Sequence, residues 1–203
     1  MPEATRLILA SGSAARRSML EAAGLTFNVI PANIDEAAIR DAIFRNTTGA
    51  GAADIASVLA AEKARVVSLA HEGALVIGAD QVLSMGGKIF TKAESIAEAR
   101  EVLKALRGRT HELVSAVALA RGGAVHWQTS DTADMTMRQF SDEFLGSYLE
   151  RMGDRALASV GCYELEGLGV QLFDRVDGDY FTILGVPLLP LLAQLRREEL
   201  VTA

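Results

Sequence analysis

The chain has 203 residues, of which 50% are hydrophobic and 23% are charged, so it is long enough to bury a sizeable core within one ordinary globular domain. Twenty Lys and Arg against 26 Asp and Glu give a formal net charge of −6, which argues against a broad basic surface that binds a nucleic-acid polymer. Any polyanionic ligand must therefore meet a local cluster of positive charge.

The sequence also indicates the cellular compartment and limits the chemistry available to cysteine. The N-terminal residues lack the basic segment and the long apolar stretch of a secretory signal, and no run approaches the roughly 18 apolar residues of a membrane span. Cys162 is the single cysteine, which excludes an internal disulfide and a cysteine-rich zinc site. We therefore expect a cytoplasmic protein with no membrane partner.

Apolar runs and their terminators predict the elements of the first part of the chain. The apolar run at 7–10 is typical of a strand, and the helix formers that follow Ser13 end at Gly24. In chain order we expect a strand at 7–10, a helix at 14–23, a strand at 27–30, a helix that begins after 34–36 and frays at 46–49, and a helix at 52–70.

The apolar run at 74–79 is typical of a strand buried on both faces, and it places Asp80 at the C-terminal end of that strand. Gly-Gly pairs then predict hairpin turns. In order, we expect strands at 81–85 and 88–91, a helix at 94–106, strands at 110–121 and 124–137, a helix opened by Ser141 and a Leu-rich helix at 187–197. Without repeats or linkers, these elements predict a mixed α/β fold in a single domain over residues 1–203.

The segment from Ser11 to Arg17 has the composition of a phosphate cradle. Hydroxyls and the backbone N–H groups of a helix N-terminus follow a strand here, with Arg16 close by. The alternative is an ordinary strand-to-helix turn in which Ser13 caps the helix and both arginines are solvated. Because arginines in a first turn oppose the helix dipole, a bound anion explains them better.

Two groups of carboxylates follow predicted strands. Asp80 lies where open α/β sheets place functional groups, but Asp is also common there as a turn residue. The pair Asp35-Glu36 either opens a helix or belongs to a metal and water site. Taken alone, Lys63 and Lys92 are typical of solvated surface lysines. The residues by themselves leave each of these alternatives open.

Read together and in order, these segments resemble the Maf family of nucleoside triphosphate pyrophosphatases. The match spans nearly the whole chain, and each motif is weak alone, so the shared order is what makes the resemblance specific. The motifs are Leu9–Arg17, Pro31–Glu36, Glu62–Ala64, Ile77–Val82, Lys92, Gly108–His111, Leu165–Gly169 and Gly178–Leu188.

The resemblance implies a mixed fold of the Maf and ITPase type, in which helices flank an elongated central sheet. It also implies a homodimer that hydrolyses a nucleoside triphosphate to the monophosphate and pyrophosphate with a divalent cation, Mg²⁺ or Mn²⁺. By motif matching, Asp80 is the proton acceptor and shares the metal environment with Glu36. The implied substrate contacts are Ser11, Ser13, Arg16, Lys63, Gln81, Lys92 and Glu166.

Three positions bear on the base of the substrate. Ala15, Gln81 and Glu166 stand where the pyrimidine-nucleotide branch of the family has Arg, Thr and Gln, and Ala15 also replaces the Trp common in the 7-methyl-GTP branch. A carboxylate accepts hydrogen bonds from the N1–H and the amine of a guanine edge, but it is repelled by the carbonyl oxygens of uracil or thymine. We therefore expect 7-methyl-GTP or another modified nucleotide as substrate, with dTTP or UTP as the alternative.

A function of another class uses the same pocket without turnover. In that alternative the protein is a nucleotide-binding regulator of cell division. The presence of Asp80 counts against it, because a purely binding site gains nothing from another negative charge beside a triphosphate. Release of pyrophosphate from a panel of nucleotides separates the two alternatives.

Overall fold

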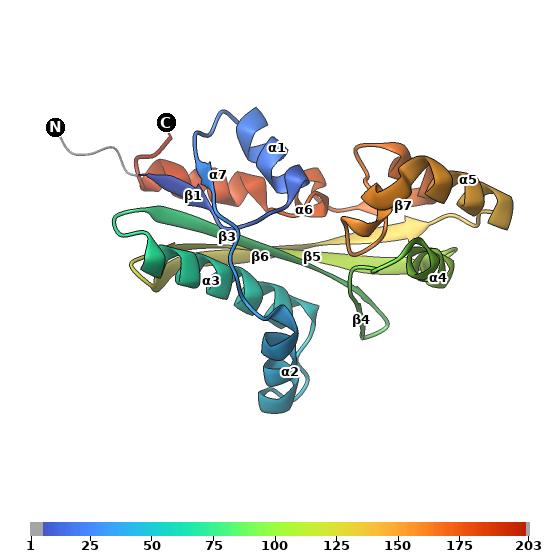
Figure 1. Cartoon of the computed structure of the whole chain (residues 1–203), viewed down its shortest axis with the longest axis horizontal. Helices are drawn as coiled ribbons and strands as arrows, with labels where there is room; N and C mark the ends of the chain where they lie inside the picture. Colours follow the sequence, from blue (N-terminus) through green and yellow to red (C-terminus); the bar gives the residue numbers. More distant parts are fainter. Residues whose placement is uncertain (1–5, 202–203) are drawn as a thin grey trace.

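The strands form one mixed seven-stranded sheet in the computed structural model, which describes residues 6–201. The order is β2-β1-β3-β5-β6-β7, and β4 pairs with β3 outside this path. The strands are β1 (Leu7–Leu9), β2 (Asn28–Val29), β3 (Leu75–Met85), β4 (Lys88–Phe90), β5 (Thr110–Arg121), β6 (Ala124–Met137) and β7 (Phe173–Asp177). Because β5 and β6 run along the length of the molecule (Figure 1), the sheet is elongated, as the resemblance implied.

Helices begin at the side chains that the sequence marks as caps. Ser13, Ser141 and Ser95 each accept a hydrogen bond from a backbone N–H in the first turn that follows, and Asp35 does the same. The α-helices are α1 (Ala14–Ala22), α2 (Glu36–Asn46), α3 (Ala52–Ala70), α4 (Ile96–Leu106), α5 (Asp142–Met152), α6 (Tyr180–Ile183) and α7 (Leu188–Arg197), with 3₁₀ turns η1 (Gly153–Leu157) and η2 (Leu168–Leu172). Among residues 6–201, no helix is long and apolar enough to cross a membrane.

Alternating side chains of β3 and β5 pack into two cores on opposite faces of the sheet. Val76 and Val114 face α3, while Ile77 and Val117 face α1 and α7. A third core fills the far end of the sheet under α4 and α5. Figure 1 shows α3 and α2 on one side of the sheet and α1, α6 and α7 on the other.

The prediction that Asp80 ends a strand is wrong. β3 continues without interruption to Met85, and Asp80 lies near its middle, paired with Ala116 of β5. The polar residues at 80 and 81 resemble a strand terminator, but β5 continues the hydrogen-bonded ladder through both positions. The short elements β7, α6, η1 and η2 are also absent from the prediction.

A gap in the sheet lies at the same place. On the edge of β3 opposite β5, β1 pairs with residues 75–77 and β4 pairs with residues 83–85. Between these pairings, the described part of the chain gives residues 78–82 no strand partner on that edge. Asp80 therefore lies at an opening in the sheet rather than at the end of a strand.

Candidate active site

A cavity of about 1600 Å³ surrounds this gap in the sheet. It is lined by residues from both sides of the sheet, including the loop before α1, the start of α2, Lys63 of α3 and residues 180–184. The segment 158–166 forms a further part of its wall. Such a volume is large enough for a nucleotide.

Lys63 is buried between two carboxylates. Its Nζ is 2.6 Å from Asp80 Oδ1 and 2.7 Å from Glu36 Oε1, and the residue is 8% exposed. α3 can approach this closely because β3 carries Gly78, where an added Cβ would lie 2.1 Å from the Ala60 carbonyl oxygen. Lys63 is thus a buried member of the site, and the surface-lysine alternative is wrong for it.

Asp80 faces α3 and is itself 7% exposed. Burial raises the pKa of its carboxyl, although the nearby charges of Lys63 and Arg16 oppose the rise. A carboxylate with a raised pKa is a better proton acceptor than an ordinary Asp. The raised pKa therefore supports the prediction that Asp80 accepts a proton, although its predicted place at the end of the strand is wrong.

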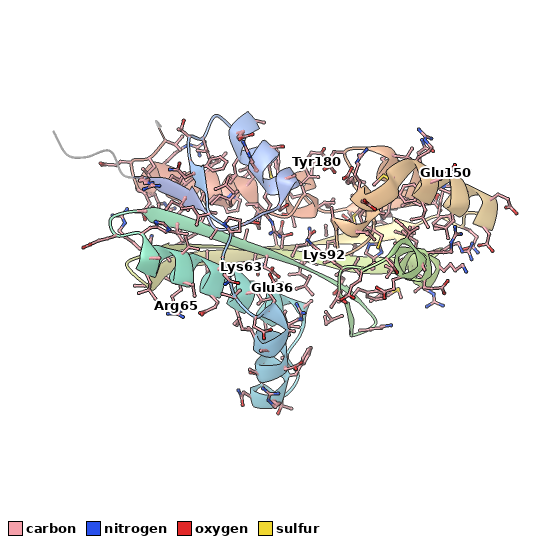
Figure 2. All side chains as sticks on the ribbon, in the orientation of Figure 1. Glu36, Lys63, Arg65, Lys92, Glu150 and Tyr180 are labelled. Atoms are coloured by element: carbon pink, nitrogen blue, oxygen red, sulfur yellow. The ribbon has the colours of Figure 1, made fainter. Side chains whose placement is uncertain are left out.

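Glu36 joins the cluster from the start of α2. Burial alone would raise its pKa, but the hydrogen bond and charge of Lys63, together with Arg40 and Lys92, lower it overall. Asp35 caps α2 through Ala38 N–H at 2.9 Å. Asp35 thus starts the helix, as the first alternative expected, while Glu36 contacts Lys63, and its place in a metal and water site stays a prediction. Figure 2 shows Glu36, Lys63 and Lys92 together near the centre of the molecule.

The loop before α1 caps the helix and leads to Arg16, which lies at the gap in the sheet. Ser13 caps the helix, Ser11 is buried, and Arg17 is solvated beside Glu21. Arg16 instead reaches into the gap, where its Nη1 donates to the Ala79 carbonyl at 3.0 Å and its Nε donates to the Gly185 carbonyl at 3.0 Å. Burial lowers the pKa of Arg16, although the charges of Asp80 and Glu36 oppose this.

Lys92 follows β4 on the cavity wall and remains solvent-accessible. Its pKa is lowered first by partial removal from water and then by the positive charge of Arg16. Lys63, Arg16 and Lys92 thus form a local cluster of positive charge in an acidic protein. Such a cluster is what the net charge of −6 led us to expect for the binding of any polyanionic ligand.

Gln81 points to the opposite face of β3 from Asp80, as strand alternation requires. Its Nε2 donates to the carbonyl oxygens of Ile183 at 2.9 Å and Thr182 at 3.2 Å, and it contacts Ser115 Oγ at 3.0 Å. The amide nitrogen of Gln81 therefore holds α6 in place. Its side chain still lines the cavity, where the role in substrate binding stays a prediction.

Segment 158–166 carries the acidic residues of the other cavity wall. Glu166 is exposed and lines the cavity. Its neighbour Glu164 is instead engaged by Arg155, whose Nε and Nη2 donate to the Glu164 carboxylate. Glu166 is thus the better placed of the two to meet a ligand.

The donor set also allows a divalent cation to be tested. Among residues 6–201 no group of three or more His, Cys, Asp or Glu side chains could hold a metal ion. Glu36 and Asp80 supply two carboxylates that share the Lys63 ammonium. Mg²⁺ is commonly bound by one or two carboxylates together with substrate phosphates, so this pair fits a cation that arrives with a triphosphate.

Sequence reasoning missed the parts of the site that no local pattern marks. Tyr180 of α6 and Arg155 of η1 line the cavity, and Tyr163 lines it with its hydroxyl 2.7 Å from His111 Nε2. The motifs Gly108–His111 and Gly178–Leu188 contain His111 and Tyr180. The spacing of the motifs did not indicate which residues these two side chains contact. Contacts across 52 residues of sequence, as between His111 and Tyr163, are set by the fold.

Known proteins share this chain's sequence over nearly its whole length. The family model "Maf-like protein" matches residues 6–198. A 7-methyl-GTP pyrophosphatase from Rhizobium etli is 50% identical over 191 residues, which cover 94% of this chain and 95% of the relative. A nucleoside triphosphate pyrophosphatase from Bradyrhizobium diazoefficiens is 50% identical over 195 residues, which cover 96% of this chain and 95% of the relative.

Among solved structures, the chain is similar to a nucleoside-triphosphatase / dITP/XTP pyrophosphatase from Mycobacterium abscessus, with a TM-score of 0.41 and 15% identity, covering 97% of this chain and 96% of that one. The family assignment depends on the sequence matches. These confirm the resemblance that the motifs indicated, and the chain belongs to the family of Maf-like proteins.

Proposed function

We propose that the protein hydrolyses a nucleoside triphosphate to the monophosphate and pyrophosphate, and that 7-methyl-GTP is its preferred substrate. The observation that carries the proposal is the Glu36–Lys63–Asp80 cluster, in which Lys63 and Asp80 are buried, and which faces a cavity of nucleotide size beside Arg16 and Lys92. The names of the relatives, 7-methyl-GTP pyrophosphatase and nucleoside triphosphate pyrophosphatase, support the same reaction.

Positive charge prepares the triphosphate for attack. Arg16, Lys63 and Lys92 are expected to bind phosphate oxygens, with Ser11 and Ser13 beside them. These charges offset the repulsion between the triphosphate and an incoming water, and they stabilise the charge that accumulates on the leaving pyrophosphate. The reaction breaks the bond between the α-phosphorus and the oxygen that bridges it to the β-phosphorus.

Asp80 is the proton acceptor in this proposal. The water oxygen forms the new bond to the α-phosphorus while its proton passes to the Asp80 carboxylate. Lys63 holds that carboxylate in a fixed position and keeps a counter-charge beside it. A buried carboxyl with a raised pKa is suited to this task, since burial increases its affinity for the proton while Lys63 keeps it in position.

Glu36 and Asp80 are the residues that would hold Mg²⁺ or Mn²⁺ together with phosphate oxygens. The cation would supply further charge neutralisation at the phosphates. Lys63 contacts one oxygen of each carboxylate, which leaves the other oxygen for the cation, and the phosphates would supply further ligands. Metal binding and nucleotide binding should consequently be coupled.

The preference for 7-methyl-GTP depends on Glu166. Its carboxylate lines the cavity and is exposed, and it is suited to accept from a guanine edge. N7-methylation also gives the base a positive charge, which a nearby carboxylate favours. dTTP or UTP remains the alternative substrate, because relatives with the general name share as much sequence with this chain as the 7-methyl-GTP pyrophosphatases do.

The test measures pyrophosphate release from 7-methyl-GTP, GTP, dTTP and UTP with Mg²⁺ or Mn²⁺. Chromatography identifies the nucleotide product. We expect a monophosphate and pyrophosphate in equal amounts, fastest from 7-methyl-GTP. Stabilisation by a nucleotide in a thermal-shift assay without any product would instead favour the non-catalytic regulator. Faster turnover of UTP or dTTP would reject the proposed base preference but keep the reaction.

The proposal also includes a cytoplasmic location and a homodimer. A cytoplasmic location agrees with a substrate drawn from the nucleotide pool, and the homodimer is what the family resemblance implies. Light scattering on the purified protein tests the dimer, since a monomer at the concentrations used for the activity assay would reject it.

A further inference from the structure

We propose that the ring of Tyr180 is the stacking platform for the base of the bound nucleotide. The inference rests on the proposed function and adds the group that recognises the flat face of the base. Four aromatic residues line the cavity within residues 6–201: Phe90, Tyr163, Tyr180 and Phe181. Phe90 and Tyr163 are buried and Phe181 is half-buried, whereas Tyr180 is 48% exposed.

The backbone under Tyr180 is held unusually firmly for so short an element. α6 spans four residues, and its start is capped by Asp179 Oδ1, which accepts from Thr182 N–H at 2.9 Å. The Thr182 carbonyl accepts from Ser115 Oγ at 2.7 Å, and the Thr182 hydroxyl donates to Asp131 Oδ2 at 2.8 Å. Gln81 adds its contacts from β3.

The backbone of α6 is therefore anchored, while the ring of Tyr180 is exposed. Thr182 is fully buried, while Tyr180, two residues earlier, presents nearly half of its surface to solvent. Phe181 supports it with a T-shaped contact whose ring centroids are 5.9 Å apart. An aromatic side chain that is preorganised in this way loses little conformational freedom when a base stacks on it.

The first turn of α1 lies beside α6 and leaves room for the base. Arg16 of α1 donates to the carbonyl of Gly185, two residues after α6 ends, and Figure 1 shows the N-terminal end of α1 next to α6. Ala15, the residue before Arg16, lines the cavity with a methyl group. Position 15 therefore offers a base no aromatic ring, whereas Tyr180 of α6 does.

Tyr180 also lies on the appropriate side of the cavity. In Figure 2 it lies on the side of α1 and α6, whereas Glu36 and Lys63 lie on the side of α2 and α3. A nucleotide whose phosphates meet the charged cluster would extend its base toward the α1 and α6 side. The cationic ring of a 7-methylguanine base gains cation–π attraction to a tyrosine in addition to stacking.

Equilibrium binding of a monophosphate tests the inference without turnover. We would titrate 7-methyl-GMP and, separately, inorganic pyrophosphate into the wild type, Tyr180→Phe and Tyr180→Ala by calorimetry. A stacked base contributes enough that its loss should weaken 7-methyl-GMP binding about 5- to 100-fold in Tyr180→Ala. Tyr180→Phe should bind within about threefold of the wild type. Pyrophosphate affinity should be unchanged in both variants.

Val170→Ala is the matched control, since Val170 is 53% exposed and lies outside the cavity lining. Melting temperatures would establish that each variant is folded. Unchanged 7-methyl-GMP affinity in folded Tyr180→Ala, or a Tyr180→Phe defect as large as that of Tyr180→Ala, would overturn the stacking role. A wild type that binds nucleotide but releases no pyrophosphate would instead reject the proposed function and leave the stacking result intact.

Discussion

The two ends of the cavity are built differently. At the charged end, Asp80 and Lys63 are buried, bonded to each other and carried by a long strand and a long helix. At the end proposed to bind the base, Glu166 and Tyr180 are exposed and are carried by a loop and a one-turn helix. The charged end is thus fixed by the sheet, whereas the base end depends on short segments joined to it.

This difference separates the reaction from its selectivity. Groups that stabilise charge in a transition state act best when they are fixed before the substrate arrives, and burial between β3 and α3 provides that. The residues proposed to contact the base, Glu166 and Tyr180, can change without disturbing the cores, because both are exposed. Variants at the charged end should therefore alter turnover and stability, and variants at the base end should alter the choice of nucleotide.

Asp80→Asn should have the largest effect. The amide keeps the shape of the side chain but cannot accept the proton, so kcat should fall about 10²- to 10⁴-fold while nucleotide binding survives. Steady-state kinetics and calorimetric titration with the same nucleotide would measure both. Asp142→Asn, at the exposed start of α5, is the control and should behave as the wild type. Turnover of Asp80→Asn at the wild-type rate would remove Asp80 from the chemistry.

Lys63→Met should cost about 3–5 kcal/mol of unfolding free energy at neutral pH, because it leaves the buried Asp80 charge without its ion-pair partner. The substitution should also raise the pKa of Asp80 further. Protonated Asp80 avoids the unpaired charge, so the stability deficit should shrink as the pH falls through that raised pKa. Chemical denaturation at several pH values measures this, with Lys104→Met as control, because the Lys104 side chain is partly exposed and its partner Glu101 lies at the surface.

The same pKa governs activity in the wild type. Since the base is inactive when protonated, kcat/KM should decline as the pH falls through the Asp80 pKa, which burial raises above the ordinary value of 3.8. Any residual activity of Lys63→Met should decline at a higher pH than that of the wild type. A pH profile that Lys63→Met leaves in place would contradict the coupling between these two residues.

Arg16→Ala and Lys92→Ala should each weaken triphosphate binding by about 1.5–3 kcal/mol and affect monophosphates much less. The two variants should differ in stability. Arg16 also satisfies the carbonyls of Ala79 and Gly185, so its loss should lower the melting temperature, whereas loss of the more exposed Lys92 should not. Lys88→Ala, outside the main cavity, is the control. Equal losses for mono- and triphosphates would place these side chains at the base or the α-phosphate.

Glu166→Gln should have the smallest effect and should act on selectivity. The amide offers a donor to a pyrimidine carbonyl, so the ratio of kcat/KM for 7-methyl-GTP to that for UTP should fall roughly 10-fold or more. Glu164→Gln is a matched control on the same segment, because Glu164 already pairs with Arg155. If the ratio moves as much in Glu164→Gln as in Glu166→Gln, selectivity does not depend on contact between Glu166 and the base.

Local signals predicted much of the fold, and non-local contacts account for what was missed. Caps such as Ser13 and Ser141 and the Gly-Gly turns are read within a few residues, so the helix starts and hairpins were found. Asp80 was misplaced because the strand that continues past it is held by β5, more than 30 residues away. β7 and α6 are too short for a periodic pattern to reveal them.

The candidate site shows the same division. The residue types at Asp80, Lys63 and Lys92 and the family motifs predicted a charged phosphate site, and the structure places all three residues on one cavity. No pattern in the sequence indicated that Lys63 bridges two carboxylates or that Gln81 holds α6, since these contacts depend on which face of β3 each side chain occupies. Strand alternation places Asp80 and Gln81 on opposite faces of β3. Treating the motif Ile77–Val82 as one site does not reveal this separation.

Hydrolysis in ¹⁸O-labelled water tests the central claim most directly. If water prepared by Asp80 attacks the α-phosphorus, the label should appear in the nucleoside monophosphate and the pyrophosphate should remain unlabelled, as mass spectrometry of both products would show. The labelled product should then form far more slowly in Asp80→Asn. Label in the pyrophosphate, or a nucleoside diphosphate and phosphate as the products, would contradict the account.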